Sequence, residues 1–338
     1  MTEEGFDIPD KDTEPPLISS FRVIDSRTVE ITCSEPVLLS NLAVSGGCAE
    51  DKTEYNGVAA CSSTATGAII SFSEPTLVGV PYSLHGVALD ASGNSLEFSQ
   101  SFRGFNENPA RMVLSEIRVG ASKKKVEYVE VYVVKSGNTS GLEIVSGNYG
   151  ESKKYVFPAI EVKQGDFITV HMKTYDKEDQ ELQNCVDETG SNLAKATATD
   201  TNPASRDLWN SATKRSVASS DVLVLRNSAP MKLMDAILYT QSGSEPVWEK
   251  KLQQEFAEAA VSQGIWQGTS SPSSNCIADG ITTAAAARSL SRQNIGMIKE
   301  HYTGDDAIIP ASPTDWIVVK KVTPGALNST DRFIAVKK

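Results

Sequence analysis

The sequence has few of the residues and motifs on which catalysis and cofactor binding usually depend. It contains three histidines, and none of them lies in an H-E-x-x-H or similar pair. No G-x-S-x-G, G-x-x-x-x-G-K-[ST] or G-x-G-x-x-G motif occurs, so neither a nucleophile elbow nor a phosphate-binding loop is indicated. The five cysteines never form C-x-x-C, which removes support for zinc ribbons and thioredoxin-type sites. We therefore predict a non-enzymatic protein without a cofactor.

Positive charge is also scarce, and this bears on the class of partner. The chain has 43 acidic and 32 basic residues among 338, for a net charge of -11. An acidic protein is repelled by phosphate backbones, so we expect no nucleic-acid partner. No apolar run approaches the roughly 18 to 20 residues that a bilayer-spanning helix needs, so we predict no membrane span in this chain.

The first sixteen residues, MTEEGFDIPDKDTEPP, are acidic and rich in proline, with almost nothing to bury. Such a composition predicts a disordered tether over residues 1–16. Domains that bacteria export often hang from the envelope on tethers of this kind. We therefore expect a bacterial protein of the cell envelope or the exterior, secreted or held as a lipoprotein by a lipid anchor added upstream of this numbering.

An exported protein meets an oxidising compartment, in which disulfides can form. Cys33 shares a strand face with Val29 and Ile31 in TVEITC, so we expect it to be a buried core thiol. Cys48 and Cys61 bracket a polar segment with little hydrophobic anchorage, and a disulfide between them would hold that loop. We predict this disulfide.

Short alternating runs separated by turn residues predict an all-β protein made of two Ig-like β-sandwich domains. The first domain covers residues 17–102. The polar stretch RGFNENPA, residues 103–110, marks the boundary. The second domain covers residues 111–338.

Two segments of the first domain resemble a known family. They are SRTVEITCSEPV, residues 26–37, and YSLHGVALDASGNSL, residues 82–96. Both resemble the bacterial Ig-like domain that is appended to surface-layer and other envelope proteins. The resemblance implies a sandwich with a spacer role.

The second domain resembles the lamin-tail domain, an Ig-like sandwich that also occurs in exported bacterial proteins. The resemblance rests on the pair Glu116–Ile117 and on a strand of aromatic, aliphatic, Glu, aliphatic, Tyr type at residues 128–132. The later segments that match are VKQGDFITVH, SDVLVLRN, MDAILY, RSLSR and TDWIVVKKVTPGALN, in that order. The resemblance to the lamin-tail domain implies a fold and assigns no catalytic residue.

Residues 173–220 and 241–287 are insertions compared with a compact lamin tail. In the second insertion, Val247, Trp248, Leu252 and Phe256 recur at helical spacing after Ser244, a residue type that favours helix starts, so we predict a helix there. Insertions on a rigid sandwich are suitable for a binding surface, and they are equally suitable for covering a sheet edge.

Individual residues give few candidates for a site. Glu130 alternates with Val129 and Val131, so we expect it on the solvated face of its strand, either hydrated or paired with a cross-strand neighbour, as a fold signature. Trp209 and Trp266 lie in the insertions, and exposed indole rings there would be candidates to face a glycan or protein ligand. The acidic loops 175–181 and 303–307 leave calcium as a weakly supported cofactor.

The leading hypothesis is a non-enzymatic exported or cell-surface protein that acts as a spacer and as a binding module for a protein or glycan. One alternative is a surface hydrolase or accessory subunit whose carboxylates meet in the inserted loops. A second alternative is a structural envelope component whose sheet edges pair with neighbouring chains.

Overall fold

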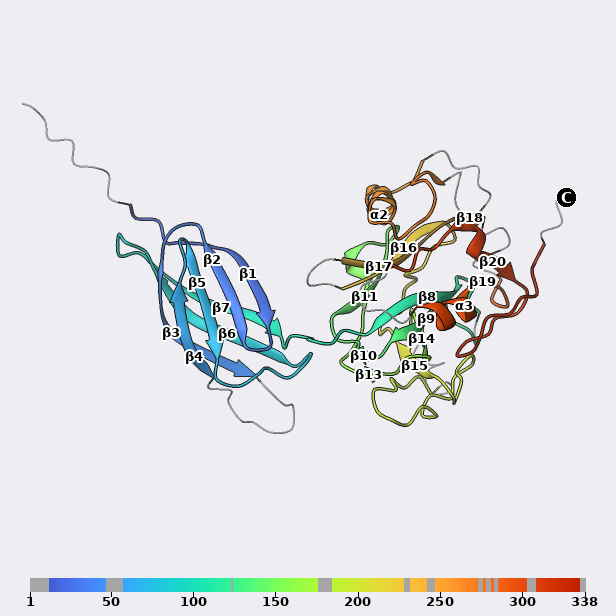
Figure 1. Cartoon of the computed structure of the whole chain (residues 1–338), viewed down its shortest axis with the longest axis horizontal. Coiled ribbons are helices and arrows are strands. Elements are labelled where there is room, and N and C mark those ends of the chain that lie inside the picture. Colours follow the sequence, from blue (N-terminus) through green and yellow to red (C-terminus); the bar gives the residue numbers. More distant parts are fainter. Residues whose placement is uncertain are drawn as a thin grey trace, which may run out of the picture. The chain divides into compact units, whose positions relative to one another are not determined.

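The computed structural model describes residues 12–46, 57–122, 124–175, 184–227, 232–241, 247–272, 276–277, 281–282, 285–302 and 308–334. The chain divides into two compact units, Met1–Glu107 and Asn108–Lys338. Both units consist mainly of antiparallel sheets (Figure 1), which confirms the predicted all-β class.

Unit 1 is a sandwich of two sheets. One sheet has the order β1-β2-β5-β4 and the other has the order β3-β6-β7. The strands are β1 (Ile18–Asp25), β2 (Thr28–Cys33), β3 (Leu38–Gly46), β4 (Val58–Ser63), β5 (Gly67–Phe72), β6 (Pro81–Leu89) and β7 (Ser95–Arg103).

The core of unit 1 follows from strand alternation. Buried and less buried positions alternate along β2, and Cys33 is buried beside Val29 and Ile31, as predicted. Phe102 stacks on Phe72 from the opposite sheet, with ring centroids 5.9 Å apart. Side chains that alternate between a buried and a solvent-facing side of the strand are expected in a sandwich whose outer faces contact water.

Unit 2 contains a five-stranded sheet of order β12-β11-β16-β17-β18 and a six-stranded sheet of order β15-β14-β9-β8-β19-β20. A short pair, β10-β13, lies outside them. The strands are β8 (Arg111–Arg118), β9 (Tyr128–Lys135), β10 (Gly137–Asn138), β11 (Leu142–Ser146), β12 (Tyr155–Val156), β13 (Glu161–Val162), β14 (Phe167–His171), β15 (Arg206–Trp209), β16 (Asp221–Asn227), β17 (Lys232–Thr240), β18 (Cys276–Ile277), β19 (Ser289–Arg292) and β20 (Trp316–Val319). The helices are η1 (Glu151–Lys153), α2 (Lys251–Ser262), α3 (Ile295–His301) and η3 (Pro313–Asp315).

The six-stranded sheet of unit 2 is buried on both faces. Its inner face carries Val129 and Val131, which join the main hydrophobic core. On the outer face, Tyr132 packs with Ile295 and Ile298 of α3. The remainder of the outer face lies beneath residues of the first insertion and of the C-terminal segment. Every residue of β9 except the last is therefore buried.

Helix α2 lies in the second insertion (Figure 1) and packs Phe256, Ala257 and Ala260 into the main core. The helix begins later than predicted. Trp248 precedes it, and Ser244 lies outside the described residues.

Among the described residues, no helix combines the length and the apolar character needed to cross a bilayer.

Candidate functional site

Five adjacent strands place a polar residue at the same level on the outer face of the six-stranded sheet. Consecutive members are register partners across β15, β14, β9, β8 and β19. We call this set the polar row, and its members are Asp207, Thr169, Glu130, Glu116 and Ser291. All five side chains are buried, although a row of this kind would be expected to face water.

A bulge in β8 places Glu116 in the row. The register of β8 on β9 shifts between Leu114, which faces Val131, and Glu116, which faces Glu130. The extra residue is Ser115. A bulge changes which face the following side chains occupy, and here it puts two glutamates opposite each other on the outer face.

Glu116 is surrounded by hydrogen-bond donors. The Tyr128 hydroxyl donates to its Oε2 at 2.5 Å, and the Ser291 hydroxyl donates to its Oε1 at 3.0 Å. The Ser289 hydroxyl donates to the same Oε1. The backbone N–H of Thr323 donates to Oε2 at 3.1 Å. Donors of this number satisfy a buried carboxylate without a metal ion or a basic side chain.

Glu130 holds the C-terminal segment. The N–H of Gly325 donates to Glu130 Oε2 at 2.5 Å, and the Thr169 hydroxyl lies 3.5 Å from the same oxygen. Burial raises the pKa of Glu130 well above its usual value, and the negative charge of Glu116 raises it further. Two facing carboxyl groups in a buried site disfavour double ionisation, so Glu130 retains its proton to higher pH.

The C-terminal segment and the first insertion cover the row together. Asn202 donates through its side-chain amide to the carbonyl oxygens of Pro324 and Gly325, both at 3.2 Å. Gly325 has φ +74°, and a Cβ there would collide with the Ser205 hydroxyl oxygen. Asn328 donates to the carbonyl oxygen of Arg292 at 2.8 Å. The TPG turn at 323–325 is therefore fixed from both sides.

A histidine lies one level further along the same face. The Nε2 of His171 lies 2.9 Å from Asp207 Oδ1, and its ring stacks on Trp209 with centroids 3.8 Å apart. Burial lowers the pKa of His171, although Asp207 acts in the opposite direction. Burial therefore favours the neutral form of the imidazole.

Arg118 completes this level. Its guanidinium pairs with Asp200 of the first insertion at 2.6 Å and lies 4.6 Å from the Tyr128 ring centroid. Lys125 pairs with the other oxygen of Asp200 at 3.1 Å. These pairs attach the first insertion to the sheet through buried charge.

The predicted solvent exposure of Glu130 is wrong. Alternation along β9 was read correctly, but the second face is covered by segments from residues 184–205 and 320–328. The polar groups of the row contact each other and backbone donors. In this structure no solvent path to the two glutamates is present among the described residues, because both are 0 % exposed.

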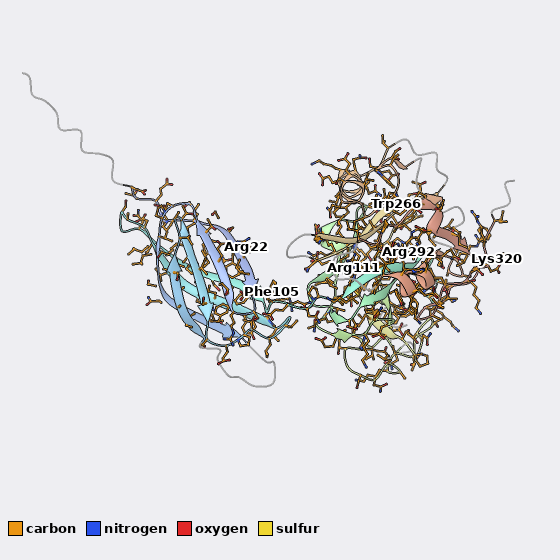
Figure 2. The ribbon with its side chains drawn as sticks, viewed as in Figure 1. Arg22, Phe105, Arg111, Trp266, Arg292 and Lys320 are labelled. Atoms are coloured by element: carbon orange, nitrogen blue, oxygen red, sulfur yellow. The ribbon has the colours of Figure 1, made fainter. Side chains whose placement is uncertain are left out.

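The predicted ligand-facing tryptophans are also buried, so the expected exposure is wrong for both. Trp209 packs on His171, and Tyr175 lies 5.7 Å away between ring centroids. Trp266 is 2 % exposed and belongs to the main core, inside unit 2 (Figure 2). Large aromatic rings in these insertions anchor the loops to the sandwich rather than facing solvent.

Acidic residues of the first insertion are also held by internal contacts. Glu188 is buried and accepts backbone N–H groups of Lys195 at 2.9 Å and Asp207 at 2.8 Å. Asp187 accepts the N–H of Trp209 at 2.6 Å. These carboxylates stabilise an irregular loop, because they satisfy backbone groups that no strand pairs.

The disulfide prediction is not tested. Cys61 is exposed on β4, and its predicted partner Cys48 lies outside the described residues. Cys33 and Cys185 are free thiols. The Cys48–Cys61 pairing stays a prediction.

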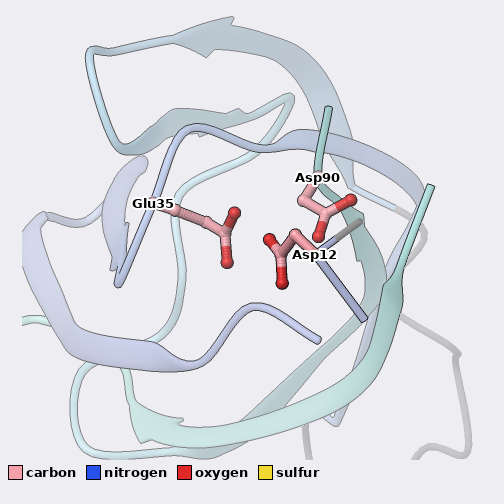
Figure 3. A group of neighbouring side chains, drawn as sticks. All are labelled: Asp12, Glu35 and Asp90. Carbon is pink, nitrogen blue, oxygen red and sulfur yellow. The ribbon is translucent and has the colours of Figure 1, made fainter. Parts of the chain in front are cut away.

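The loops considered for calcium, residues 175–181 and 303–307, also lie outside the described residues, except for Tyr175. Instead, Asp12, Glu35 and Asp90 of unit 1 each place an oxygen within 4.8 Å of the others (Figure 3). Oxygen ligands suit Ca²⁺. However, Asp90 already accepts the backbone and side-chain N–H groups of Asn94, both at 2.8 Å, in the β6–β7 turn. We assign no metal to this group.

The sequence motifs had a common location that sequence reasoning missed. Segments 115–117, 128–132, 288–292 and 314–328, far apart in the chain, meet at the polar row. In the same region Arg292 forms a fully buried ion pair with Asp235 of the MDAILY segment at 2.9 Å. The chain order of the motifs gave no sign of this, since it says nothing about which strands are neighbours.

The proteins to which this chain is similar include one relative and two solved structures. An "Uncharacterized protein" of Treponema pallidum (strain Nichols) is 28% identical over 207 residues, which cover 59% of this chain and 51% of the relative. The chain thus spans about half the length of that curated relative.

The two solved structures show low similarity. The N-terminal part of the bacterial S-layer protein SbsC has a TM-score of 0.25 at 19% identity, covering 46% of this chain and 37% of that one. A DUF4876 family protein from Bacteroides thetaiotaomicron has a TM-score of 0.34 at 11% identity, covering 88% of this chain and 96% of that one.

The family model TP_1001_2nd, described as "protein second domain", matches residues 110–318, which include nearly all of unit 2 except its C-terminal end. Since the match covers more than half of the chain, this chain belongs to the TP_1001_2nd, "protein second domain", family.

Proposed function

We propose that this chain is a non-enzymatic exported or cell-surface protein of a bacterium, in which unit 1 acts as a spacer and unit 2 binds a protein or glycan. The observation that carries the proposal is the state of the polar row. Glu116 and Glu130 are buried and contact backbone donors of the TPG turn. A pair used in this way stabilises a sandwich and leaves recognition to other surfaces.

The meeting of the motif segments also supports a lamin-tail-like character for unit 2. In this proposal the signature residues close the fold, because Glu130 holds the turn at Gly325 and Glu116 holds Thr323. The acidic N-terminal segment supports placement at the envelope or outside the cell, on a lipid anchor or in secreted form. No nuclear role is part of the proposal.

The experiment is limited proteolysis of intact source cells, followed by mass spectrometry of the released peptides. We expect peptides from the insertions, residues 173–220 and 241–287, to be released while a cytosolic marker protein stays intact. Lysed cells serve as the control for cleavability. Release only after lysis would overturn the surface placement.

A hydrolase assay tests the enzymatic alternative separately. Broad glycosidase and esterase substrates are offered to the purified protein, to its Glu116→Gln variant and to its Glu130→Gln variant. We expect no turnover by any of them. Turnover that either substitution abolishes would overturn the non-enzymatic proposal, because it would show that the carboxylate pair reaches a substrate.

A further inference from the structure

A polar pocket of about 270 Å³ lies at one end of the five-stranded sheet of unit 2. At this end β11 and β17 finish, β16 begins, and α2 starts close by. The residues that line it are Asn148, Ala218, Ser219, Ser220, Thr240, Val247, Trp248, Glu249 and Gln253. The pocket is separate from the polar row, which lies on the other sheet of the unit.

Asp221 lies behind the wall of this pocket and binds the segments that form the wall. It is fully buried and accepts the Ser146 hydroxyl at 2.5 Å and the backbone N–H of Asn148 at 2.9 Å. The side-chain amide of Gln253 lies 3.4 Å from the same carboxylate. One carboxylate thereby connects the loop after β11, the start of β16 and the helix α2, so the three walls keep a fixed relative position.

Two further contacts make the pocket rigid. The indole N–H of Trp248 donates to the carbonyl oxygen of Ser270 at 2.7 Å, which sets the orientation of the ring. Gly147 lies so close to α2 that a Cβ there would approach the Gln253 Cα at 2.8 Å. A pocket whose walls are already in place loses little conformational entropy when it binds a ligand.

Several polar side chains of the pocket have no protein partner. Within the described part of the chain, the side chains of Asn148, Ser219 and Glu249 make no hydrogen bond to other residues. They supply an amide, a hydroxyl and a carboxylate around the same space. Buried Gln253, 2 % exposed, adds a polar wall, and Trp248 adds an aromatic one.

The chemical groups of the lining residues favour one class of ligand. No lining residue is basic and one is acidic, so an anion would meet repulsion from Glu249 without a counter-charge. Amide, hydroxyl and carboxylate groups together donate to and accept from neighbouring hydroxyls of a sugar. The volume lies just below the range of about 300–1,000 Å³ typical of small-molecule sites, which fits one sugar ring.

We propose that this pocket binds a single neutral sugar residue of a glycan, with Asn148 and Glu249 as its hydrogen-bonding residues. The inference rests on the proposed binding function and narrows it from a protein or glycan to a glycan. Trp248 forms the apolar wall against which the ring lies.

The experiment is saturation-transfer NMR on the full chain with neutral methyl glycosides of glucose, galactose, mannose and N-acetylglucosamine. Variants are Asn148→Ala, Glu249→Gln and their combination. The matched control is Glu258→Gln, since Glu258 lies on α2 outside the pocket and contacts Gln254 at 2.6 Å. Tryptophan emission and the unfolding midpoint verify that each variant is folded.

We expect at least one glycoside to bind, and each single substitution to weaken its Kd by about tenfold, the effect of one lost hydrogen bond. The control keeps the affinity of the original chain. Unchanged binding by the double variant would show that the sugar does not bind in this pocket. The proposal that the chain recognises a glycan would then remain. Absence of binding by all four glycosides overturns the sugar assignment, and proteolysis of intact cells then decides the surface proposal independently.

Discussion

Glu116 and Glu130 face each other on adjacent strands with both side chains fully buried, and each one accepts a backbone N–H from the same C-terminal turn. Two buried acids side by side would repel each other if both were ionised. The turn and the surrounding hydroxyl groups make the arrangement stable, and the raised pKa of Glu130 favours its protonated form, which avoids two adjacent negative charges. All four tryptophans belong to unit 2, so tryptophan fluorescence reports the unfolding of that unit.

The first prediction concerns the pH dependence of stability. The pKa of Glu130 is raised on folding, so its contribution to stability is full below its unfolded value of about 4.5 and is lost as the pH rises through the folded value. Glu130→Gln resembles the protonated form and does not titrate. We therefore expect the unfolding free energy of the original chain to fall relative to this variant as the pH rises above the unfolded value. Urea unfolding followed by tryptophan fluorescence measures the difference. A difference that is constant with pH would contradict the account.

The second prediction concerns the TPG turn. Gly325→Ala places a Cβ at φ +74° against Ser205 and Asn202. Gly165→Ala is the matched control, because Gly165 has φ +96° and open space around the added atom. We expect the control to cost about 1–2 kcal/mol from the left-handed backbone alone. Gly325→Ala should cost about 1–3 kcal/mol more from overpacking. Equal losses in urea unfolding would show that the turn is not packed as described.

The third prediction concerns the buried ion pair. Asp235→Ala leaves the guanidinium of Arg292 buried without its carboxylate, and Leu114 loses an acceptor for its N–H as well. We expect a loss of about 3–5 kcal/mol in the unfolding free energy of unit 2. Asp331→Ala removes the exposed pair with Lys320 and should change stability little. A small effect of Asp235→Ala would mean that the pair is accessible to water.

The fourth prediction concerns the histidines. Burial lowers the pKa of His171, so its imidazole should titrate below the usual value of 6.5. The stability linked to the neutral ring is present above pH 6.5 and is lost as the pH falls toward the folded pKa. NMR of the three histidine rings, His85, His171 and His301, measures this directly. A His171 titration at or above the ordinary value would contradict its burial beside Trp209.

The fifth prediction concerns the cysteines. Peptide mapping of the native protein without reduction should recover Cys48 linked to Cys61. A disulfide closing this loop should contribute about 2–4 kcal/mol to the stability of unit 1. Recovery of both residues as free thiols from freshly isolated envelope material would contradict the predicted disulfide.

Much of the fold was predictable from the sequence because strand alternation is a local property. Val29, Ile31 and Cys33 alternate in the sequence and are buried in the structure. The residues around Glu130 alternate equally well, yet that pattern cannot reveal that a second layer covers the polar face. The covering residues, Asn202 and Gly325, are about 70 and 195 positions away, and only the tertiary fold brings them there.

The prediction of where α2 starts was wrong for a related reason. The helical spacing of Val247, Trp248 and Leu252 is real, but Trp248 is fixed outside the helix by its bond to Ser270. Likewise, the two tryptophans were expected to be exposed because they lie in insertions. Acidic residues of the first insertion, Asp187 and Glu188, instead turn inward to satisfy backbone N–H groups. At these positions tertiary contacts, rather than the local sequence pattern, determined the structure.

The most direct test of the central claim is amide hydrogen exchange at Thr323 and Gly325, measured by NMR on the full chain. The account predicts that both amides are protected to a degree comparable with those of β8 and β9, because each N–H donates to a buried glutamate. Exchange at the rate of an unstructured chain would contradict it. The turn would then open readily, and Glu116 and Glu130 would reach solvent as a carboxylate pair outside the inserted loops.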